Sequence, residues 1–218
     1  MVKKVKADNK QRALDYMKNK IIVCEYQPGE AINIDEVAAE LEISKTPVRE
    51  ALLELQYENY VQVIPRKSTI VSKISPKEIE QIYGARLILE TAIYNNLQKE
   101  DLEKHKDELI QLKEYWTMLD ISSKAKDGYI EALNEDLLFH KTLVGVSNNT
   151  YLVYYAQELL LKSQRYWHIG FYNNRFQIVK EEHLQILDAM LSGDINKVVK
   201  LIQKHITASV AIFDFLSE

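Results

Sequence analysis

The feature that most constrains the fold is a change of pattern at Ser75-Pro76. Before it, three short segments with helical spacing of apolar residues precede two runs rich in β-branched residues, at 60–64 and 69–74. Two such runs joined by a short polar segment predict a β-hairpin. After it, every segment has the period of an amphipathic helix. The sequence therefore predicts a mostly α protein, with three helices and a hairpin wing in residues 1–75 and an all-helical bundle in residues 76–218.

The first part has the arrangement of a winged helix-turn-helix. Helices are expected over 10–23 and 34–41, with Asn33 as the N-cap of the second. Ser44 is expected to cap a third helix, because Pro47 falls in its first turn, where proline is tolerated. The short second helix, the capped third helix and the following hairpin together indicate a DNA-binding domain.

The second part is expected to contain six helices, over 77–98, 101–118, 127–147, 149–168, 175–192 and 194–216. No apolar run approaches the ~20 residues of a membrane-spanning helix, and the N-terminus lacks the apolar core of a signal peptide. A single cysteine among 218 residues fits a reducing compartment. These features predict a soluble, cytoplasmic protein with no membrane partner.

Charge is distributed unevenly along the chain. The net charge is −4, which argues against a uniformly basic nucleic-acid coat. Residues 1–20 nevertheless hold seven Lys and Arg against two Asp and Glu. A basic N-terminal segment on an otherwise acidic chain is typical of a DNA-binding domain attached to a second domain. A solvated Lys-rich tail is the alternative explanation.

The most specific string in the chain begins at Ser44 and reads SKTPVREAL. It predicts a helix start that presents Lys45, Thr46 and Arg49 away from an apolar stripe. In a helix-turn-helix these first turns enter the major groove, where an arginine can hold guanine through two hydrogen bonds. We expect Arg49 to contact guanine, Lys45 to contact guanine or phosphate, and Ser44 and Thr46 to contact phosphates. An amphipathic helix with a merely hydrated polar face is the alternative.

Four residues of the helical part suggest a metal site. Asp136 and His140 are four residues apart and share one helix face, while His183 and His205 each fall within an apolar stripe of another helix. Carboxylate and neutral imidazole are ligands for zinc, nickel, cobalt or manganese, and a bundle core can hold such a site. The alternatives are histidines hydrogen-bonded in the core and a local Asp136–His140 ion pair.

Arg86 also lies within an apolar stripe and should point inward. A buried guanidinium needs an anion. Glu90, one turn further on, is one candidate partner, and a bound carboxylate ligand is the other, because arginine holds carboxylates through two hydrogen bonds. Asn149 and Arg165 are further candidates for an effector pocket.

The first part resembles the GntR family of bacterial transcription regulators. The resemblance rests on SKTPVREAL, on Gln27-Pro28-Gly29-Glu30 and on the hairpin. It implies that Lys45 and Arg49 read bases and that Ser44 and Thr46 contact the DNA backbone.

The chain departs from this family pattern at three places. Cys24 and Glu42 stand where many relatives have glycine, and the wing tip lacks the usual glycine that lets the backbone enter the minor groove. The wing-tip residues Arg66 and Lys67 are therefore expected to contribute phosphate contacts.

The helical part resembles the FCD effector domain of the FadR-like branch. The motifs that carry this resemblance are Arg86 with Leu89-Glu90, Asp136-Leu-Leu-Phe-His140, Ser147-Asn148-Asn149, Glu182-His183-Leu-Gln-Ile-Leu, Ser192-Gly193-Asp194 and Lys204-His205-Ile206. In metal-binding members the acid and three histidines are ligands, which implies the same role for Asp136, His140, His183 and His205. The resemblance also implies a homodimer and a small carboxylate effector that coordinates the metal.

The sequence thus predicts a DNA-binding transcriptional regulator rather than an enzyme. It would bind a near-palindromic double-stranded operator as a homodimer and respond to a small carboxylate at a divalent metal, with zinc first and nickel next. A metal-dependent hydrolase or non-haem oxygenase is one alternative, since such a ligand set can activate water. A regulator with a purely structural metal is the other.

Overall fold

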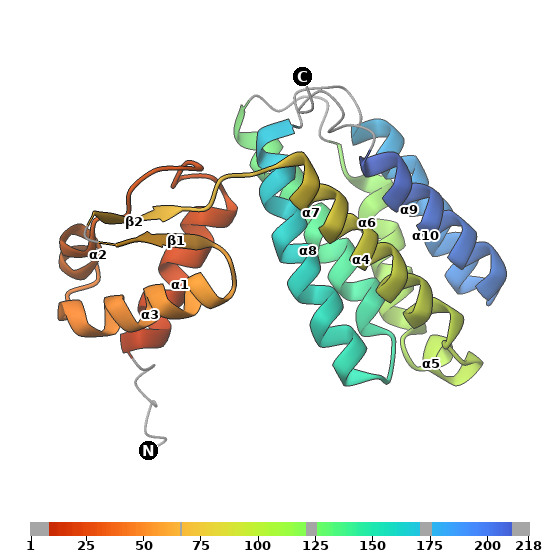
Figure 1. Cartoon of the computed structure of the whole chain (residues 1–218). Coiled ribbons are helices and arrows are strands. Elements are labelled where there is room, and N and C mark those ends of the chain that lie inside the picture. Colours follow the sequence, from red (N-terminus) through yellow and green to blue (C-terminus); the bar gives the residue numbers. More distant parts are fainter. Residues whose placement is uncertain (1–8, 66, 121–125, 171–175, 211–218) are drawn as a thin grey trace, which may run out of the picture. The chain divides into compact units, whose positions relative to one another are not determined.

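The computed structural model describes residues 9–65, 67–120, 126–170 and 176–210. The chain forms two compact units, Met1–Ile74 and Ser75–Glu218. The predicted fold class is confirmed, because the first unit combines three helices with a two-stranded antiparallel sheet and the second is entirely helical in its described residues (Figure 1).

The first unit contains α1 (Asn9–Ile22), α2 (Ile34–Glu40), α3 (Lys45–Tyr57), β1 (Val61–Ile64) and β2 (Ser68–Val71). Helices α1 and α3 pack together through the apolar stripes that the sequence shows, with Met17, Val48 and Leu55 fully buried. The two strands pair in antiparallel register from Val61 opposite Val71 to Ile64 opposite Ser68. Both strands are shorter than the β-branched runs, but the hairpin lies where it was predicted.

Three residues other than glycine adopt left-handed backbone conformations among the described residues. Cys24, Glu42 and Asn59 have φ angles of 55°, 56° and 64°. Glu42 follows α2, where its amide donates to the Ala39 carbonyl and the Ile43 amide donates to the Ala38 carbonyl. This is the helix-ending geometry that glycine serves best, because a Cβ atom strains the left-handed region. The absence of glycine at Cys24 and Glu42 is therefore a local cost of this sequence.

Glu42→Gly is expected to stabilise the protein by up to about 1 kcal/mol, since relief of this strain exceeds the entropy that glycine adds to the unfolded chain. The measurement is the midpoint of urea unfolding. Ala39→Gly is the control, because Ala39 is exposed and lies inside α2. There glycine should destabilise by about 1 kcal/mol. Equal destabilisation by both substitutions would contradict the expectation.

The second unit contains α4 (Pro76–Asn95), α5 (Lys99–Lys104), α6 (Lys106–Met118), α7 (Lys126–Gly145), α8 (Thr150–Gly170), α9 (Phe176–Leu191) and α10 (Ile195–Val210). The helix predicted over 101–118 is two helices that meet at His105. The pattern did not reveal this joint because the buried Leu102 and Leu109 are seven residues apart, which also fits one continuous helix.

The helices of this unit pack against one another in succession. Helix α7 packs on α8, α8 on α4, α4 on α10, α10 on α9, and α9 on α6 (Figure 1). Helix α4 thus lies between α8 and α10, and it also contacts α7. Over the described residues, no helix has the length and apolar character needed to cross a membrane.

Candidate functional site

The start of α3 presents polar side chains on one face. Lys45, Thr46 and Arg49 are exposed, while Val48 and Leu52 on the opposite face are buried. Ser44 occupies the N-cap position in an extended conformation, and its side chain makes no capping hydrogen bond. The polar face predicted from the sequence is therefore exposed to solvent at the N-terminal end of α3, where the helix dipole is positive.

Lys45 is held by an ion pair on the surface of this unit. Its Nζ lies 2.8 Å from Oδ1 of Asp35 on α2, and both side chains are well exposed. An exposed pair of this kind contributes little energy, so a phosphate can replace Asp35. At the wing, Lys67 is exposed, and its amide donates to the Ile64 carbonyl to close the turn. Arg66 lies outside the described residues.

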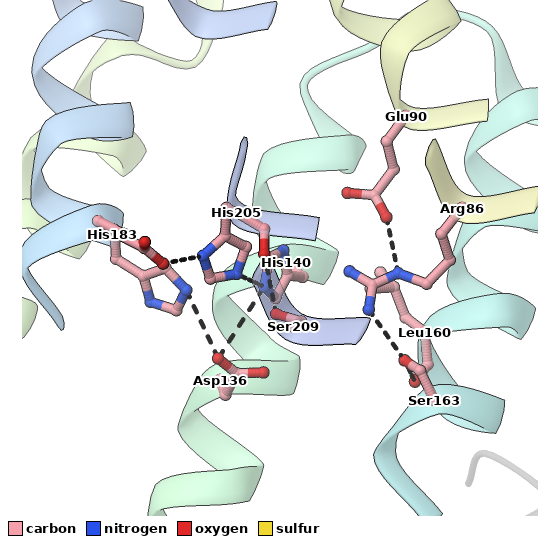
Figure 2. Close-up of polar contacts among 10 residues, drawn as sticks. Arg86, Glu90, Asp136, His140, Leu160, Ser163, His183, His205 and Ser209 are labelled. Atoms are coloured by element: carbon pink, nitrogen blue, oxygen red, sulfur yellow. Dashed lines mark hydrogen bonds and ion pairs between the residues drawn. The ribbon is translucent and has the colours of Figure 1, made fainter. Parts of the chain in front are cut away.

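In the second unit, the four proposed metal ligands come together from three helices. Asp136 and His140 lie on α7, His183 on α9 and His205 on α10, and one ligand atom of each lies within 4.8 Å of all the others. Figure 2 shows the three imidazoles and the carboxylate facing one another. Nε2 of His140 is 3.1 Å from Nε2 of His205. Oδ1 of Asp136 is 3.5 Å from Nε2 of His183 and 3.9 Å from Nε2 of His140.

This geometry fits a transition metal ion. Ligand atoms bound at about 2.1 Å stand about 3.0 Å apart at a right angle and about 3.4 Å apart at the tetrahedral angle. Two of the three separations, 3.1 and 3.5 Å, match this range, and the third, 3.9 Å between Asp136 and His140, is longer. Both ring nitrogens of the fully buried His183 lack a hydrogen bond within the described part of the chain. Because buried polar atoms normally have partners, an ion that accepts the lone pair of one of these nitrogens would account for that nitrogen.

Surrounding residues fix the orientation of two imidazoles. The His183 ring stacks on Phe139 with a centroid distance of 3.6 Å and meets the edge of Trp116 at 4.4 Å. Oε2 of Glu182 lies 2.8 Å from Nδ1 of His205. A carboxylate accepts, so Nδ1 of His205 donates to Glu182, and Nε2 on the other side of the ring faces the cluster. The sequence pattern assigns Glu182 no role, because its partner is 23 residues away.

Burial favours the neutral forms of three cluster residues, His140, His183 and Asp136. Burial keeps the pKa of His140 well below its usual range, and the neighbouring His205 and Arg86 act in the same direction. Burial, with the nearby His205, also lowers the pKa of His183. Burial raises the pKa of Asp136 to about 6, although His205 and Arg86 oppose this shift. The two histidines are thus unprotonated at neutral pH, and the carboxyl group competes with a proton just below it.

Metal affinity should therefore fall by about tenfold between pH 7 and pH 5 through Asp136 alone, since below about pH 6 a proton must leave this carboxyl group before it ligates. In the metal-free protein the raised pKa of Asp136 has the opposite effect on folding stability. Its stabilising contribution is complete below the pKa that Asp136 has in the unfolded chain, and it is lost as the pH rises through about 6. The increase in Tm on adding zinc should accordingly shrink from pH 7 to pH 5. An equal increase in Tm at the two pH values would contradict the assignment.

A narrow cavity lies beside the cluster. It is lined by Arg86, Leu133, Asp136, Leu137, His140, Leu160, Ser163, Gln164 and Trp167, and its volume of about 10 Å³ holds about one water molecule. Arg86 is buried, as its stripe predicts, and its Nε donates to Oε1 of Glu90 at 2.9 Å. Its Nη1 donates to Oγ of Ser163 at 3.1 Å (Figure 2). Of the two anions considered from the sequence, Glu90 is thus present within the protein.

The other two effector candidates do not line this cavity. Asn149 is exposed, and its Oδ1 accepts from the Leu152 amide at 3.1 Å, which makes it a cap at the start of α8. Arg165 is buried on α8 but is not among the lining residues. The structure therefore brings Arg86 close to the proposed metal ligands and places Asn149 and Arg165 elsewhere.

Comparisons with known families and proteins cover both units. Residues 9–71 match the model of bacterial regulatory proteins of the gntR family, and residues 81–208, more than half of the chain, match the FCD domain. The gluconate operon transcriptional repressor of Bacillus licheniformis is 32% identical over 58% of this chain and 50% of its own length. That of Bacillus subtilis (strain 168) is 31% identical over 67% of this chain and 58% of its own length. The chain thus spans little more than half of these curated relatives.

A solved structure shares the fold. A GntR transcriptional regulator from Rhodococcus sp. RHA1 superposes with a TM-score of 0.77 at 19% identity, covering 94% of this chain and 97% of that one. The families and relatives matched are transcriptional regulators and not enzymes.

Proposed function

The chain belongs to the GntR family of bacterial regulatory proteins and carries an FCD domain. From this premise we propose that it is a transcriptional regulator whose affinity for its operator is set by a small carboxylate bound at a metal site. The observation that carries the proposal is the convergence of one acid and three histidines beside the buried Arg86. The exposed start of α3 supplies the DNA-binding part.

On DNA, α3 would enter the major groove with its N-terminal turns. Arg49 would hold a guanine through two hydrogen bonds, and Lys45 would exchange Asp35 for a guanine or a phosphate. Ser44 and Thr46 would position the helix on phosphates, and Lys67, together with Arg66, would add phosphate charge from the wing.

In the helical unit, Asp136, His140, His183 and His205 would hold a divalent ion, with zinc first and nickel next. Glu182 would keep His205 in the tautomer that ligates. When bound, the ion would supply a Lewis acid that attracts a carboxylate oxygen of the effector. Arg86, whose guanidinium borders the same cavity, would bind and orient that carboxylate.

The proposal includes a homodimer formed through the helical unit. From Gln81 to Gln98 the only charged residues are Arg86 and Glu90, and both are buried, so the outer face of α4 carries no charge over this length. Ile88 stands on that face with 72% of its surface exposed. The cores of protein interfaces are depleted in charge, and an uncharged face can pair with its own copy about a twofold axis.

Ile88→Glu is expected to weaken dimerisation by about tenfold, because it places two like charges near the twofold axis. Light scattering over a dilution series measures the effect, and residues 76–218 alone should dimerise in the same way. Met118→Glu is the control, since Met118 has 85% of its surface exposed but lies at the end of α6 and not on α4. A monomeric wild type at micromolar concentration would overturn the dimer, and equal weakening by both variants would move the interface away from α4.

DNA retardation with the purified full-length chain tests the proposed function. Operator affinity is measured without metal, with zinc, and with zinc plus a carboxylate, for which gluconate is a suitable first probe given the operon named for the two Bacillus relatives. A change in affinity on adding a carboxylate, which needs zinc, supports the proposal. Stable zinc binding with no effect of any carboxylate on DNA would favour a structural metal. Failure to retard DNA under all conditions would overturn the assignment.

A further inference from the structure

We propose that Phe139 raises the affinity of the four-residue cluster for zinc, because its aromatic face stabilises the His183 ring more strongly when a metal ion is bound. This inference rests on the metal site proposed above. Phe139 carries no ligand atom, so it is a positioning residue that acts through the imidazole it contacts. The observation behind it is the geometry of these two rings.

Phe139 and His183 lie nearly face to face inside the bundle. Their ring centroids are 3.6 Å apart, and the ring planes differ by only 7°. Because stacked carbon atoms touch at about 3.5–4.0 Å, a centroid distance this short leaves little room for a sideways offset between the rings. Both residues have 0% of their surface exposed, so no bulk water screens the interaction between them.

A face-to-face stack of this kind is not the arrangement that two neutral aromatic rings prefer. The face of an aromatic ring is negative and its edge is positive, so neutral pairs favour an offset or an edge-to-face contact. The same negative face attracts a positive charge, and it does so most strongly where water is excluded. The stack of Phe139 on His183 is therefore favoured when the imidazole carries positive charge.

A metal ion bound to His183 would supply that charge. Nε2 of His183 lies 3.5 Å from Oδ1 of Asp136, and neither ring nitrogen of His183 has a hydrogen bond within the described part of the chain. An ion at Nε2 would withdraw electron density from the ring, so that the imidazole shares the positive charge. The attraction to Phe139 is then stronger in the metal-bound protein than in the metal-free protein, and this difference adds to the metal affinity.

Phe176 offers a matched ring without this contact. It stacks on Trp116 with a centroid distance of 5.8 Å and an angle of 21° between the planes. Trp116 in turn meets His183 at 4.4 Å and 76°. Phe176 thus belongs to the same group of aromatic side chains, but its stacking partner is a tryptophan and not a proposed metal ligand.

The test replaces Phe139 in the full-length chain by phenylalanines that carry one, two or three fluorine atoms, introduced at that position alone. Fluorine withdraws electrons from the ring face and weakens its attraction for positive charge, while the ring keeps its shape. Zinc affinity, measured by competition with a chelator, should fall with each added fluorine, by about tenfold in total. The same series at Phe176 should leave zinc affinity unchanged.

Two further measurements separate this effect from packing. Phe139→Leu keeps an apolar side chain but removes the ring face, so its zinc affinity should fall at least as far as with three fluorine atoms. With cobalt in place of zinc, the absorption spectrum should keep its shape across the fluorine series, because all four proposed ligands remain in position. The fluorine series also decides the matter if Phe139→Leu does not fold.

The outcomes distinguish this inference from the function on which it rests. Zinc affinity that stays constant across the series at Phe139, or that falls equally in the series at Phe176, would overturn the role of Phe139 while leaving the metal site in place. A loss of affinity confined to Phe139→Leu would show that Phe139 only packs against His183. If the wild type binds neither zinc nor cobalt, the metal site itself is wrong, and the stack is an ordinary contact in the core.

Discussion

His183→Ala is expected to abolish stoichiometric metal binding. The variant loses one of the four proposed ligands, the ring that stacks on Phe139 and makes a T-shaped contact with Trp116. A ligand that binds only the folded state stabilises it by about 2.7 kcal/mol at a hundredfold excess over Kd. The increase in Tm that zinc gives the wild type should therefore disappear in the variant. Elemental analysis and thermal unfolding, each before and after chelation, measure the result.

Matched variants separate ligation from packing. His183→Ala also leaves a cavity, so its Tm is compared with that of metal-free wild type. Asp136→Asn creates no cavity and should lose metal similarly. Glu182→Gln should lower metal affinity by about 10- to 100-fold, as removal of an orienting carboxylate does. His105→Ala is the control for metal binding, because His105 lies at the joint of α5 and α6 and is not one of the four cluster residues.

One result would end the metal assignment. If wild type purified without chelator contains no stoichiometric transition metal, and zinc and nickel leave its Tm unchanged, the three histidines are hydrogen-bonded core residues. The effector would then depend on Arg86 and its neighbours alone.

Arg49→Ala is expected to weaken specific DNA binding by about 1–3 kcal/mol, the scale of one guanine contact through two hydrogen bonds. Its side chain is exposed in the second turn of α3, opposite the buried stripe, so the substitution should leave the fold intact. Binding to operator and to random DNA is measured at several salt concentrations. Operator affinity should fall more than random affinity.

Lys67→Ala provides the contrast, because a wing lysine that contacts phosphate carries no sequence information. It should lower both affinities alike and reduce the salt slope by about one unit. If Arg49→Ala instead lowers both affinities equally, Arg49 contacts only phosphate and another residue reads the bases.

Local sequence patterns determined the elements of this protein and the faces they bury. The spacing of Met17, Val48 and Leu55 predicted the packed faces of α1 and α3, and the β-branched runs predicted the hairpin. These predictions succeed because helix and strand periods act over a few residues. The same reasoning predicted that His183 and His205 point inward, since each occupies an apolar stripe.

Only the tertiary structure decided which of these inward residues meet. Asp136 and His140 share a helix face, but their distances to His183 and His205 depend on how α7, α9 and α10 pack, and side-chain spacing within one helix carries no information on that. Glu182 was missed for the same reason, since it reaches His205 from another helix. The sequence left Arg86 with two candidate anions, and the 2.9 Å contact identifies Glu90 as its partner within the protein. Periodicity thus determines the direction of a side chain, whereas the order in which helices pack determines its neighbours.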